Sequence, residues 1–540
     1  MEYVAMTLLL ITFLMHQSVA NGVTTYNVVN LGAKPDGKTD STKAFLSAWA
    51  SACASGNPAT IYVPPGTYLM GEAYFHGEHC SNTGKGITFR IDGTLVAPSD
   101  YRDVGNAGSW IKFEKVSGVS IYGGVLDGRG SALWACKASS SNNCPIGATT
   151  LAFYNSNNIV VNGVTSVNSQ KFHIVINRCQ NVMLQGTKVS ASGKSPNTDG
   201  IHIQMSSGVT VLNSRIATGD DCISIGPGSS NLWIENVACG PGHGISIGSL
   251  GWELQEPGVK NVTVKTVTFT STSNGVRIKT WGRPSKGFVD GVVFQHIVMV
   301  NVQNPILIDQ NYCPHNSCPT QNSGVKINDV TYQDIHGTSA TKVAVRLSCS
   351  KKNPCSEIKL EDVNLSYGHS PAEASCVNAE GTTSGVIVPT SCFIGSLGWE
   401  LQEPGVKNVT VKTVTFTSTS NGVRIKTWGR PSKAFVDGVV FQHIVMLNVQ
   451  NPILIDQNYC PHNSCPTQNS GVKINDVTYQ DIHGTSATKV AVRLSCSKKN
   501  PCSEIKLEDV NLSYGHSPAE ASCVNAEGTT SGVIVPSSCL

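Results

Sequence analysis

Six polar residues between positions 199 and 279 have side chains that together could carry out acid and base chemistry. They are three carboxylic acids, one imidazole and two cations: Asp199, Asp220, Asp221, His243, Arg277 and Lys279. A protonated and an ionised carboxyl group in one cleft are what glycoside hydrolysis requires. Cationic side chains beside them suit a substrate that carries its own carboxylates. This chemistry depends on residues distant in sequence lying close together in space.

The six residues come into register when the short strands around them are aligned on their first inward apolar residue. The alignment points are Ile201, Ile223, Ile245 and Val276. Relative to these points, Asp199, Asp221 and His243 fall two residues before, Asp220 three before, and Arg277 and Lys279 one and three after. The positions after the alignment point have outward parity on a strand whose Ile residues point inward. Asp199 and Asp221 lie two residues before an inward Ile, so on a continuous strand they would also point inward. For their side chains to reach the surface, a turn must end before Gly200 and Cys222.

The strands that carry these residues belong to two interleaved families. The first family has the segments NIVVNGV from Asn158, NVMLQGT from Asn181, GVTVLNS from Gly208, NLWIENV from Asn231, NVTVKTV from Asn261, GVVFQHI from Gly291, GVKINDV from Gly324 and EIKLEDV from Glu357. The second family lies between them and ends or centres on Ile176, Ile203, Ile225, Ile247, Ile278 and Leu347. The first five segments recur every 23 to 30 residues, with Gly, Asn and Ser at the turns.

This periodicity predicts an all-β chain, a right-handed parallel β-helix of stacked coils. A β-sandwich is the alternative, but its turns should come every 8 to 12 residues and its strands should not form two alignable families. Adjacent coils lie about 4.8 Å apart, so the six side chains should form one patch. Mutual repulsion should then raise the pKa of at least one carboxyl group. A helix over Ser41 to Ala54, with Asp40 as its N-cap, would cover the open end of the first coil.

Four segments also carry a resemblance to a known family. SPNTDGIHI around Asp199, TGDDCISIGPGS around Asp220, CGPGHGISIGSLG around His243 and GVRIKTW around Arg277 resemble the signature segments of plant polygalacturonases, which are glycoside hydrolases that act on pectin. The resemblance extends from Tyr26 to Cys392. It implies a β-helix enzyme that hydrolyses the α-1,4 link between galacturonates with inversion and needs no metal or other cofactor.

The resemblance also implies a role for each residue of the site. Asp220 would be the general acid, and Asp199 with Asp221 would position and deprotonate the attacking water. His243 would support the ionisation state of the acid. Arg277 and Lys279 would bind the galacturonate carboxylate, and Tyr312 in DQNYC would line the sugar site.

A large internal duplication departs from this pattern. Ile247 to Cys392 recurs as Ile394 to Cys539, shifted by 147 residues, and only three positions differ. The differing pairs are Gly287 and Ala434, Val300 and Leu447, and Thr390 and Ser537. Residue 393 is the only joint, so the copy is not tethered by a flexible linker. We therefore expect a catalytic β-helix domain over residues 21–392 and a duplicated β-helix segment over residues 393–539.

The copy begins after the strand positions that would hold the acids, so it has no counterparts of Asp199, Asp220, Asp221 and His243. It can present Arg424, Lys426 and Tyr459, but a second active site is excluded by this inventory. Three interpretations remain open: a folded extension, an accessory surface that binds polygalacturonate through Arg424 and Lys426, or a recombination or gene-assembly product that destabilises the chain. The first and the third are favoured.

The N-terminus and the cysteines indicate a secreted protein. An apolar run from Val4 to Met15, followed by small residues up to Ala20, is typical of a signal peptide over residues 1–20. All 19 cysteines lie beyond it, and secretion favours disulfides. Short loops suggest pairs 136 with 144, 313 with 318, 349 with 355 and 376 with 392, with 53 to 80 and 222 to 239 as longer candidates. Cys179 is left over as a buried, inert thiol.

Composition limits the other possible functions. Charged residues are 14% of the chain and the net charge is +3. The sequence has no basic block of the kind that nucleic-acid-binding proteins carry, which argues against that function. No apolar stretch after residue 20 is long enough to span a membrane. N-x-[ST] sequons at Asn261, Asn364, Asn408 and Asn511 are consistent with a secreted glycoprotein. We expect a monomeric extracellular protein. Two alternatives stay open: a calcium-dependent pectate lyase, and a catalytically silent protein that binds pectin.

Overall fold

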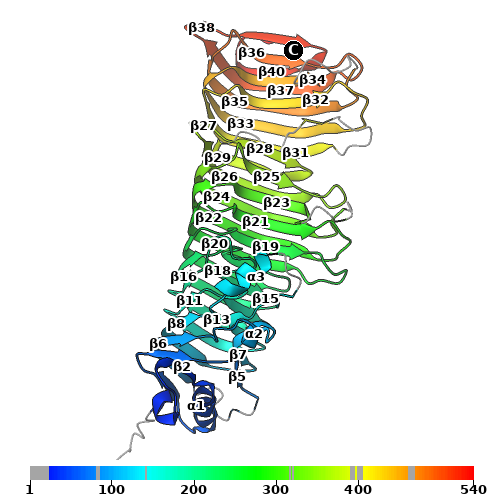
Figure 1. The fold of residues 1–540 in the computed structure, drawn as a ribbon. Coiled ribbons are helices and arrows are strands. Elements are labelled where there is room, and N and C mark those ends of the chain that lie inside the picture. Colours follow the sequence, from blue (N-terminus) through cyan, green and yellow to red (C-terminus); the bar gives the residue numbers. More distant parts are fainter. Residues whose placement is uncertain are drawn as a thin grey trace, which may run out of the picture.

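The computed structural model describes residues 23–78, 80, 86–139, 143–314, 318, 322–388, 396–397, 405–459 and 469–540. The predicted signal peptide lies outside these residues, as do Cys392 and the joint at residue 393. The described chain forms one column of stacked coils that runs from α1 to β40 (Figure 1).

The first strand family forms one 24-stranded sheet that runs the length of the column. Its strands are β1 (Thr24–Asn27), β2 (Asp36–Asp40), β3 (Ala59–Val63), β4 (Thr67–Leu69), β6 (Ile87–Val96), β8 (Val119–Asp127), β10 (Asn157–Asn162), β11 (Thr165–Val167), β13 (Gln180–Gln185), β14 (Lys188–Ser190), β16 (Ser207–Ala217), β18 (Ser230–Cys239), β20 (Val259–Thr270), β22 (Phe288–Val302), β24 (Lys326–Ser339), β26 (Cys355–Tyr367), β27 (Ser370–Pro371), β29 (Ala379–Val388), β31 (Val406–Thr417), β33 (Phe435–Val449), β35 (Lys473–Ser486), β37 (Cys502–Tyr514), β38 (Ser517–Pro518) and β40 (Ala526–Val535).

The second strand family forms two sheets, of 11 and 5 strands. The 11-stranded sheet holds β5 (Ala73–His76), β7 (Ser109–Glu114), β9 (Thr149–Tyr154), β12 (Ile174–Asn177), β15 (Ile201–Gln204), β17 (Ile223–Ile225), β19 (Ile245–Leu250), β21 (Asn274–Trp281), β23 (Asn304–Tyr312), β25 (Val343–Ser348) and β28 (Glu373–Val377). The 5-stranded sheet holds β30 (Ser396–Leu397), β32 (Asn421–Trp428), β34 (Asn451–Tyr459), β36 (Val490–Ser495) and β39 (Glu520–Val524). The predicted parallel β-helix is confirmed, although β23 was missing from the predicted series.

Each coil contributes inward side chains that stack on equivalent side chains of the next coil. In the large sheet, Val209 pairs with Leu232, which in turn pairs with Val262, and all three are buried. The alternation of apolar and polar residues thus places one apolar column along the axis of the helix. The buried residues of the described chain form a single core that continues into the copy.

Asparagine and glycine turn the chain where a strand of the large sheet begins. Asn158, Asn181, Asn231 and Asn261 all have φ between 53° and 55°. Asn tolerates this left-handed conformation better than most residues because its short side chain can form local hydrogen bonds. The same side chains also bond between coils, since Asn181 Nδ2 donates to Asn158 Oδ1 at 2.6 Å and Asn261 Nδ2 donates to Asn231 Oδ1 at 3.1 Å.

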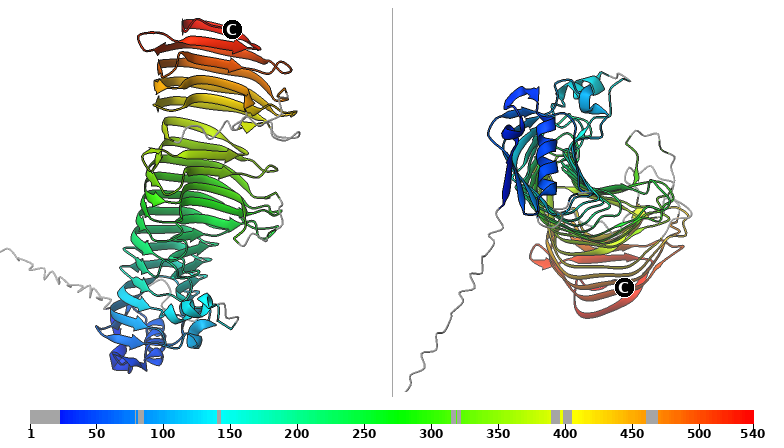
Figure 2. Two further views of the ribbon diagram at one scale, coloured as in Figure 1. Left: turned by 45° about the horizontal axis from the view of Figure 1, so that its top comes forward. Right: turned by 90° about the horizontal axis from the view of Figure 1, so that it is seen from below.

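A helix covers the N-terminal end of the column, as predicted. α1 (Thr42–Ala54) buries Phe45 and Trp49, and the Trp49 ring packs on Phe75 and Phe89 with centroids 5.5 and 6.0 Å apart. Its N-cap residue is Ser41 rather than Asp40, but the Asp40 carboxylate still accepts a hydrogen bond from the Thr42 N–H at 2.9 Å. Figure 2 shows α1 lying across the end of the coils.

Three further short helical segments were not predicted from the sequence. They are a 3-10 turn, η1 (Val28–Leu31), and the helices α2 (Arg102–Gly105) and α3 (Ser131–Ala138). They lie in connections between coils, and their apolar periodicity is too weak to predict a helix.

The large sheet continues across the joint between the two blocks, whereas the smaller sheet is interrupted. β29 and β31 are linked by the single register pair Thr383 with Val411, whereas β20, the counterpart of β31, pairs with β18 at eight positions. β28 ends the 11-stranded sheet and β30 begins the 5-stranded one. The copy therefore stacks on the end of the column through the large sheet, and the contact buries Thr383 to 3% exposure.

The disulfides follow the predicted pairs wherever both cysteines are described. The bonds join 53 with 80, 136 with 144, 222 with 239, 313 with 318, and 349 with 355, and Cys179 is free and buried. Cys376 is disulfide-bonded, and its predicted partner Cys392 lies outside the described residues. In the copy, the equivalent bonds join 496 with 502 and 523 with 539.

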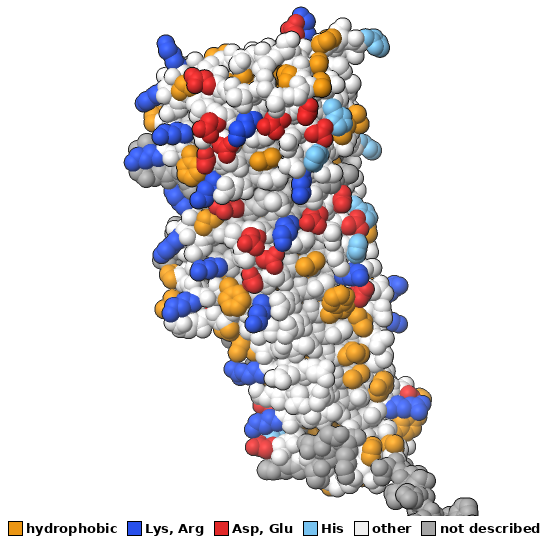
Figure 3. All heavy atoms as spheres, turned by 180° about the vertical axis from the view of Figure 1, so that it is seen from behind, with side chains coloured by type: hydrophobic (Ala, Val, Ile, Leu, Met, Phe, Trp, Pro, Cys, Tyr) orange, Lys and Arg blue, Asp and Glu red, His pale blue; other side chains and the backbone are white. Residues whose placement is uncertain are grey.

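The face of the column in Figure 3 carries charged side chains of both signs together with scattered hydrophobic ones. Lys, Arg, Asp and Glu side chains are interspersed over the C-terminal half of the face in Figure 3, without a field of one sign. All four sequon asparagines are exposed. No helix within the described ranges is long and apolar enough to cross a membrane.

Candidate active site

The register of the second sheet agrees with the alignment made from the sequence. Ile201 pairs with Ile223, Ile223 with Ile245, and Ile245 with Val276. β15 and β17 begin at Ile201 and Ile223, so Asp199 and Asp221 lie in the turns before the first strand residue. The turn that their parity required is therefore present. Strands of four consecutive coils bring all six predicted polar residues to one stretch of the sheet.

Asp221 is the centre of the cationic part of the site. Its side chain is 1% exposed and accepts hydrogen bonds from Arg277 Nη2 at 2.8 Å and from Lys279 Nζ at 2.9 Å. The Ser246 hydroxyl donates a third bond at 2.8 Å and accepts one from Arg277 Nε at 3.0 Å. A carboxylate buried this deeply is tolerated because two cations and a hydroxyl compensate its charge. Arg277 and Lys279 are in turn fixed by the carboxylate.

Asp220 faces the opening of the site and is paired with His243. Its Oδ1 lies 3.0 Å from His243 Nδ1, and its side chain is 20% exposed, more than that of Asp221. The His243 backbone N–H also donates to the Asp220 carbonyl oxygen at 2.7 Å, which fixes the two residues of neighbouring coils relative to each other. Asp220 is thus able to reach a bound molecule while remaining hydrogen-bonded.

The surroundings shift the pKa values of two of the carboxyl groups in opposite directions. Burial raises the pKa of Asp199 well above its usual range, and the neighbouring charges of Asp221 and Asp220 raise it further. At Asp220, burial also favours the protonated form, but the His243 hydrogen bond and charge outweigh it and leave the pKa lowered. The predicted raised pKa is therefore found, and it belongs to Asp199 in the ligand-free site.

The carboxyl groups open into a cleft of about 630 Å³. Asp199, Asp220, Asp221, Lys279 and Tyr312 line it. The Tyr312 ring lies 5.2 Å from Lys279 Nζ and packs edge-on against Trp281. The structure thus brings Tyr312 to the site. The lining residues all lie between Phe172 and Tyr312, so no described residue of the copy enters or closes the cleft.

Several lining residues were not predicted from the sequence. They are Phe172, Arg178, Asn197, His202, Gln204, Met205, Trp252 and the loop residues around Glu256. His202 stacks on Phe172 with ring centroids 4.9 Å apart, and burial lowers its pKa. His202 and Gln204 fall one and three residues after Ile201, which are the outward positions that Arg277 and Lys279 hold on their own strand. The same parity rule would therefore have found them.

A metal ion is not needed to explain the arrangement. Ligand atoms of Asp220, Asp221 and His243 lie within 4.8 Å of one another, which is close enough to share an ion. Both Asp221 oxygens already accept bonds from cationic side chains, however. Their positive charges would repel a divalent cation at this place. The site favours an anionic ligand over a metal.

Comparison with protein-family models connects this geometry to one enzyme family. The model described as "Glycosyl hydrolases family 28" matches residues 53–392 and, a second time, residues 390–539. The two matches together cover most of the chain, and the second one falls on the copy.

Curated relatives align over about 380 residues of the chain. A polygalacturonase from Prunus persica is 67% identical over 386 residues, which are 71% of this chain and 97% of that relative. An exopolygalacturonase from Platanus acerifolia is 44% identical over 378 residues, which are 69% of this chain and 99% of the relative. These relatives are thus aligned almost completely while more than a quarter of this chain stays outside the alignment.

Solved structures share the fold. A polygalacturonase from Erwinia carotovora ssp. carotovora has a TM-score of 0.50 at 25% identity, covering 64% of this chain and 92% of that one. An endo-xylogalacturonan hydrolase from Aspergillus tubingensis has a TM-score of 0.59 at 24% identity, covering 66% and 96%.

Proposed function

The chain belongs to family 28 of the glycosyl hydrolases, and we propose that it is a polygalacturonase that hydrolyses the α-1,4-galacturonosyl links of pectin with inversion. The observation that carries the proposal is the cleft lined by three carboxyl groups and Lys279, with Arg277 bonded to one of these carboxylates. The acids supply the proton and the activated water, and the cations suit a polymer with a carboxylate on every sugar.

In the proposed mechanism, Asp220 is the general acid. It is the more exposed of the two ion-paired carboxyl groups of the cleft, and its partner is the imidazole of His243, whereas Asp221 is held by two cations. In the ligand-free site its lowered pKa works against proton donation. A bound galacturonate brings a negative charge next to it, and like-charge repulsion raises a carboxyl pKa. Substrate binding would thus favour the protonated form of the acid when the acid is needed.

Asp199 and Asp221 are proposed to hold and deprotonate the attacking water. Asp221 is fixed by its two cations and Ser246, so it can orient a water molecule. The raised pKa of Asp199 means that the group holds a proton in the ligand-free site, and once this proton has left, its carboxylate is a stronger base than an ordinary one. Arg277, Lys279 and Tyr312 would bind the carboxylate and the ring of the sugar. No cofactor takes part in any of these steps.

Residues 21–392 are proposed as the catalytic domain, and residues 393–539 as a catalytically incomplete β-helix extension. All residues that line the cleft belong to the first of these segments. With the N-terminal signal expected from the sequence, the protein would act outside the cell, in the wall that contains its substrate.

The test is the release of reducing ends from polygalacturonate by the full chain in the presence of EDTA. Activity that resists the chelator supports hydrolysis and opposes a calcium-dependent lyase. Asp220→Asn should abolish the activity, whereas Asp456→Asn in the copy is a matched loss of one carboxylate outside the cleft and should not. A folded but inactive wild-type chain that still binds polygalacturonate would contradict the proposal and favour the silent binding protein. The anomeric form of the first product, followed by polarimetry or NMR, tests inversion.

A further inference from the structure

The copy repeats the cationic part of the active site without the carboxylate that occupies it. Arg424, Lys426 and Tyr459 are the counterparts of Arg277, Lys279 and Tyr312. They lie on β32 and β34, which pair with each other as β21 and β23 do. Tyr459 and Trp428 pack with ring centroids 5.2 Å apart, as Tyr312 and Trp281 do. The local arrangement of the cluster is therefore preserved.

Neither of the two hydrogen-bond partners of Arg277, Asp221 and Ser246, has a counterpart in the copy. Asp221 lies before the duplicated segment, and the counterpart of Ser246 in the sequence alignment of the two blocks is Phe393, a residue type without a hydrogen-bonding side-chain atom. In agreement, Arg424 Nε is buried and has no hydrogen-bond partner among the described residues. A buried unpaired donor of this kind is costly, and an external acceptor would satisfy it.

Asp456, the hydrogen-bonded partner of Arg424, only partly compensates the positive charges of Arg424 and Lys426. Arg424 Nη2 bonds to Asp456 Oδ2 at 3.2 Å. No hydrogen bond or ion pair to Lys426 Nζ is found within the described ranges, and this ammonium group lies 4.6 Å from the Tyr459 ring centroid. Burial, and next the charge of Arg424, lower the pKa of Lys426. The two cations therefore share the Asp456 carboxylate, and the charge of Glu373 in the first block adds only a smaller attraction on Lys426.

The cluster is also more accessible than the one in the active site. The Arg424 side chain is 24% exposed, against 12% for Arg277. Lys426 is half-buried, whereas Lys279 is buried. Half-buried cations beside an aromatic ring combine a charged contact for a carboxylate with an apolar surface for a sugar ring.

We propose that Arg424, Lys426 and Tyr459 form a second, non-catalytic binding site for a galacturonate of the pectin chain. The ligand carboxylate would take the place between the two cations that Asp221 fills in the first block. The identity of the ligand rests on the proposed function, while the carboxylate preference rests on the cluster alone. The two clusters are about five coil spacings apart on one side of the column, on the order of 25 Å. A polymer held at the second site would stay at high local concentration near the cleft.

The test uses the full chain with Asp220→Asn, which keeps the polymer intact, and measures its affinity for polygalacturonate. Adding Arg424→Gln and Lys426→Gln should weaken binding about tenfold, the size expected for losing one or two charge-assisted hydrogen bonds. The matched control replaces Lys359 and Lys506, two surface cations paired with Asp329 and Asp476 on the large sheet, by Gln. This control removes the same charge and should leave the affinity unchanged. Equal affinities of the two double variants would overturn the proposal.

A carboxyl-reduced polymer tests what the site recognises. If the second site binds carboxylates, the two double variants bind this neutral polymer equally. A loss of affinity in the Arg424→Gln and Lys426→Gln variant for the reduced polymer too would contradict carboxylate recognition.

A second measurement needs no substitution in the cluster, so it does not depend on the variants folding. Acetylation of Lys426 is followed by mass spectrometry with and without polygalacturonate. Ala434 in the copy, against Gly287 in the first block, distinguishes the two otherwise identical peptides. Protection of Lys426 by the polymer supports the proposal, and equal labelling overturns it.

The two proposals can fail separately. If the wild-type chain releases reducing ends but neither the affinity nor the labelling of Lys426 responds as expected, only the second site is wrong. If no hydrolysis is found but Lys426 is protected and the double variant loses affinity, the second site stands and the proposed activity is wrong.

Discussion

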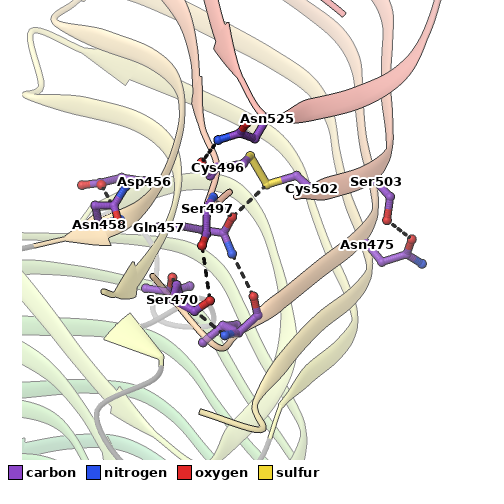
Figure 4. The surroundings of a disulfide bond; sticks show 12 residues. Asp456, Gln457, Asn458, Ser470, Asn475, Cys496, Ser497, Cys502, Ser503 and Asn525 are labelled. Carbon is purple, nitrogen blue, oxygen red and sulfur yellow. Dashed lines mark hydrogen bonds between the residues drawn. A yellow bond between two sulfur atoms is a disulfide. The ribbon is translucent and has the colours of Figure 1, made fainter. Parts of the chain in front are cut away.

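The first block, residues 247–392, and its copy, residues 394–539, fold alike where their contacts are internal. Gln310 and Gln457 show this best. Each donates to a backbone carbonyl at 2.8 Å, Val325 or Val472, and accepts a 2.7 Å bond from the N–H that follows a disulfide cysteine. Figure 4 shows this corner in the copy, where Asn525 also donates to the Cys496 carbonyl at 3.0 Å.

The two blocks differ where a contact depends on the coils before them. Arg277 bonds to Asp221 and Ser246, whereas Arg424 bonds to Asp456. The local sequence thus determines the backbone, the disulfides and the packing, but the preceding coils determine the ionic partners. In this fold an active site is a property of consecutive coils, and duplicating some of them copies the binding groups without the chemistry.

The largest difference between the blocks should appear in catalysis. Asp221→Asn should lower kcat/KM on polygalacturonate by about 10²- to 10⁴-fold, the usual loss for a group that moves a proton. Asp456→Asn, which removes the carboxylate that pairs with Arg424, should stay within about twofold because a partly exposed ion pair outside the cleft contributes little. Initial rates of reducing-end release measure both. Comparable losses in the two variants would show that the copy takes part in turnover.

Next in size is the effect on stability of removing either arginine. Arg277→Gln leaves the buried Asp221 with one cation fewer and should lower the free energy of unfolding by about 3–5 kcal/mol. Arg424→Gln breaks a partly exposed pair and should cost about 0–1 kcal/mol. Denaturant unfolding, followed by tryptophan fluorescence, compares the two. A larger cost for Arg424→Gln would contradict the difference in burial on which the comparison rests.

The dependence of stability on pH should have opposite signs in the two regions. The pKa of Asp199 is raised in the folded protein by burial and by Asp221, so the folded state binds this proton more tightly than the unfolded one. The protonated Asp199 therefore contributes to stability at low pH, and this contribution is lost as the pH rises above about 4, the pKa of an Asp in the unfolded chain. Asp199→Asn should therefore raise the melting temperature at pH 7 relative to wild type, and this gain should shrink at pH 4.

Asp481 in the copy is the opposite-sign control. The pKa of Asp481 is lowered in the folded protein, first by the hydrogen bond from His443. Its ionised carboxylate therefore contributes to stability above the pKa of an unfolded Asp, and this contribution is lost as the pH falls. Asp481→Asn should thus lower the melting temperature slightly at pH 7, with the loss disappearing in acid. Melting curves of both variants at pH 4 and pH 7 check the signs, and parallel shifts would contradict the assignment.

A smaller effect distinguishes the joint from the end of the column. Thr383 Oγ1 is buried against the copy and has no hydrogen-bond partner among the described residues, whereas its counterpart Thr530 is exposed on β40. Thr383→Val should stabilise the chain by about 1 kcal/mol because it removes an unsatisfied buried group. Thr530→Val should change little. Equal effects in denaturant unfolding would show that the copy does not cover Thr383 in solution.

The smallest expected change concerns the cleft when the copy is removed. Truncation after Cys392 should leave kcat/KM on short oligogalacturonates within about twofold, because no described residue of the copy lines the cleft and distant sites act independently. Soluble yield measured in parallel tests whether the copy burdens folding. Loss of folding on truncation would show that the copy has become part of the structure.

Much of this architecture was accessible from the sequence because a parallel β-helix repeats one physical rule. Alternation fixes which side chains face inward, and the coil period fixes which residues stack, so aligning Ile201 with Ile223 was enough to place the acids together. β23 was not predicted. Its sequence starts with Asn304 and Pro305, which are typical of a turn, and this start does not match the other strands of the second family.

Other features depend on information that the local pattern does not contain. The pairing of Asp220 with His243 and the resulting direction of its pKa depend on the conformation of the turns between strands. The bond from Arg424 to Asp456 depends on the absence of Asp221, which no inspection of the copy by itself reveals. His202, by contrast, obeys the same parity rule as Arg277, one residue after the alignment point of its strand.

The last strand of the column has a consequence for how such chains lengthen. β40 repeats the sequence of β29 letter for letter, and β29 is the strand on which the copy stacks through β31. β40 therefore has the same sequence as the strand that receives β31. A further duplication would need no new interface, since each added segment restores the growing end for the next. A second round of duplication would thus add a block through the same kind of strand contact as the first, as expected of a solenoid whose repeats touch only their neighbours.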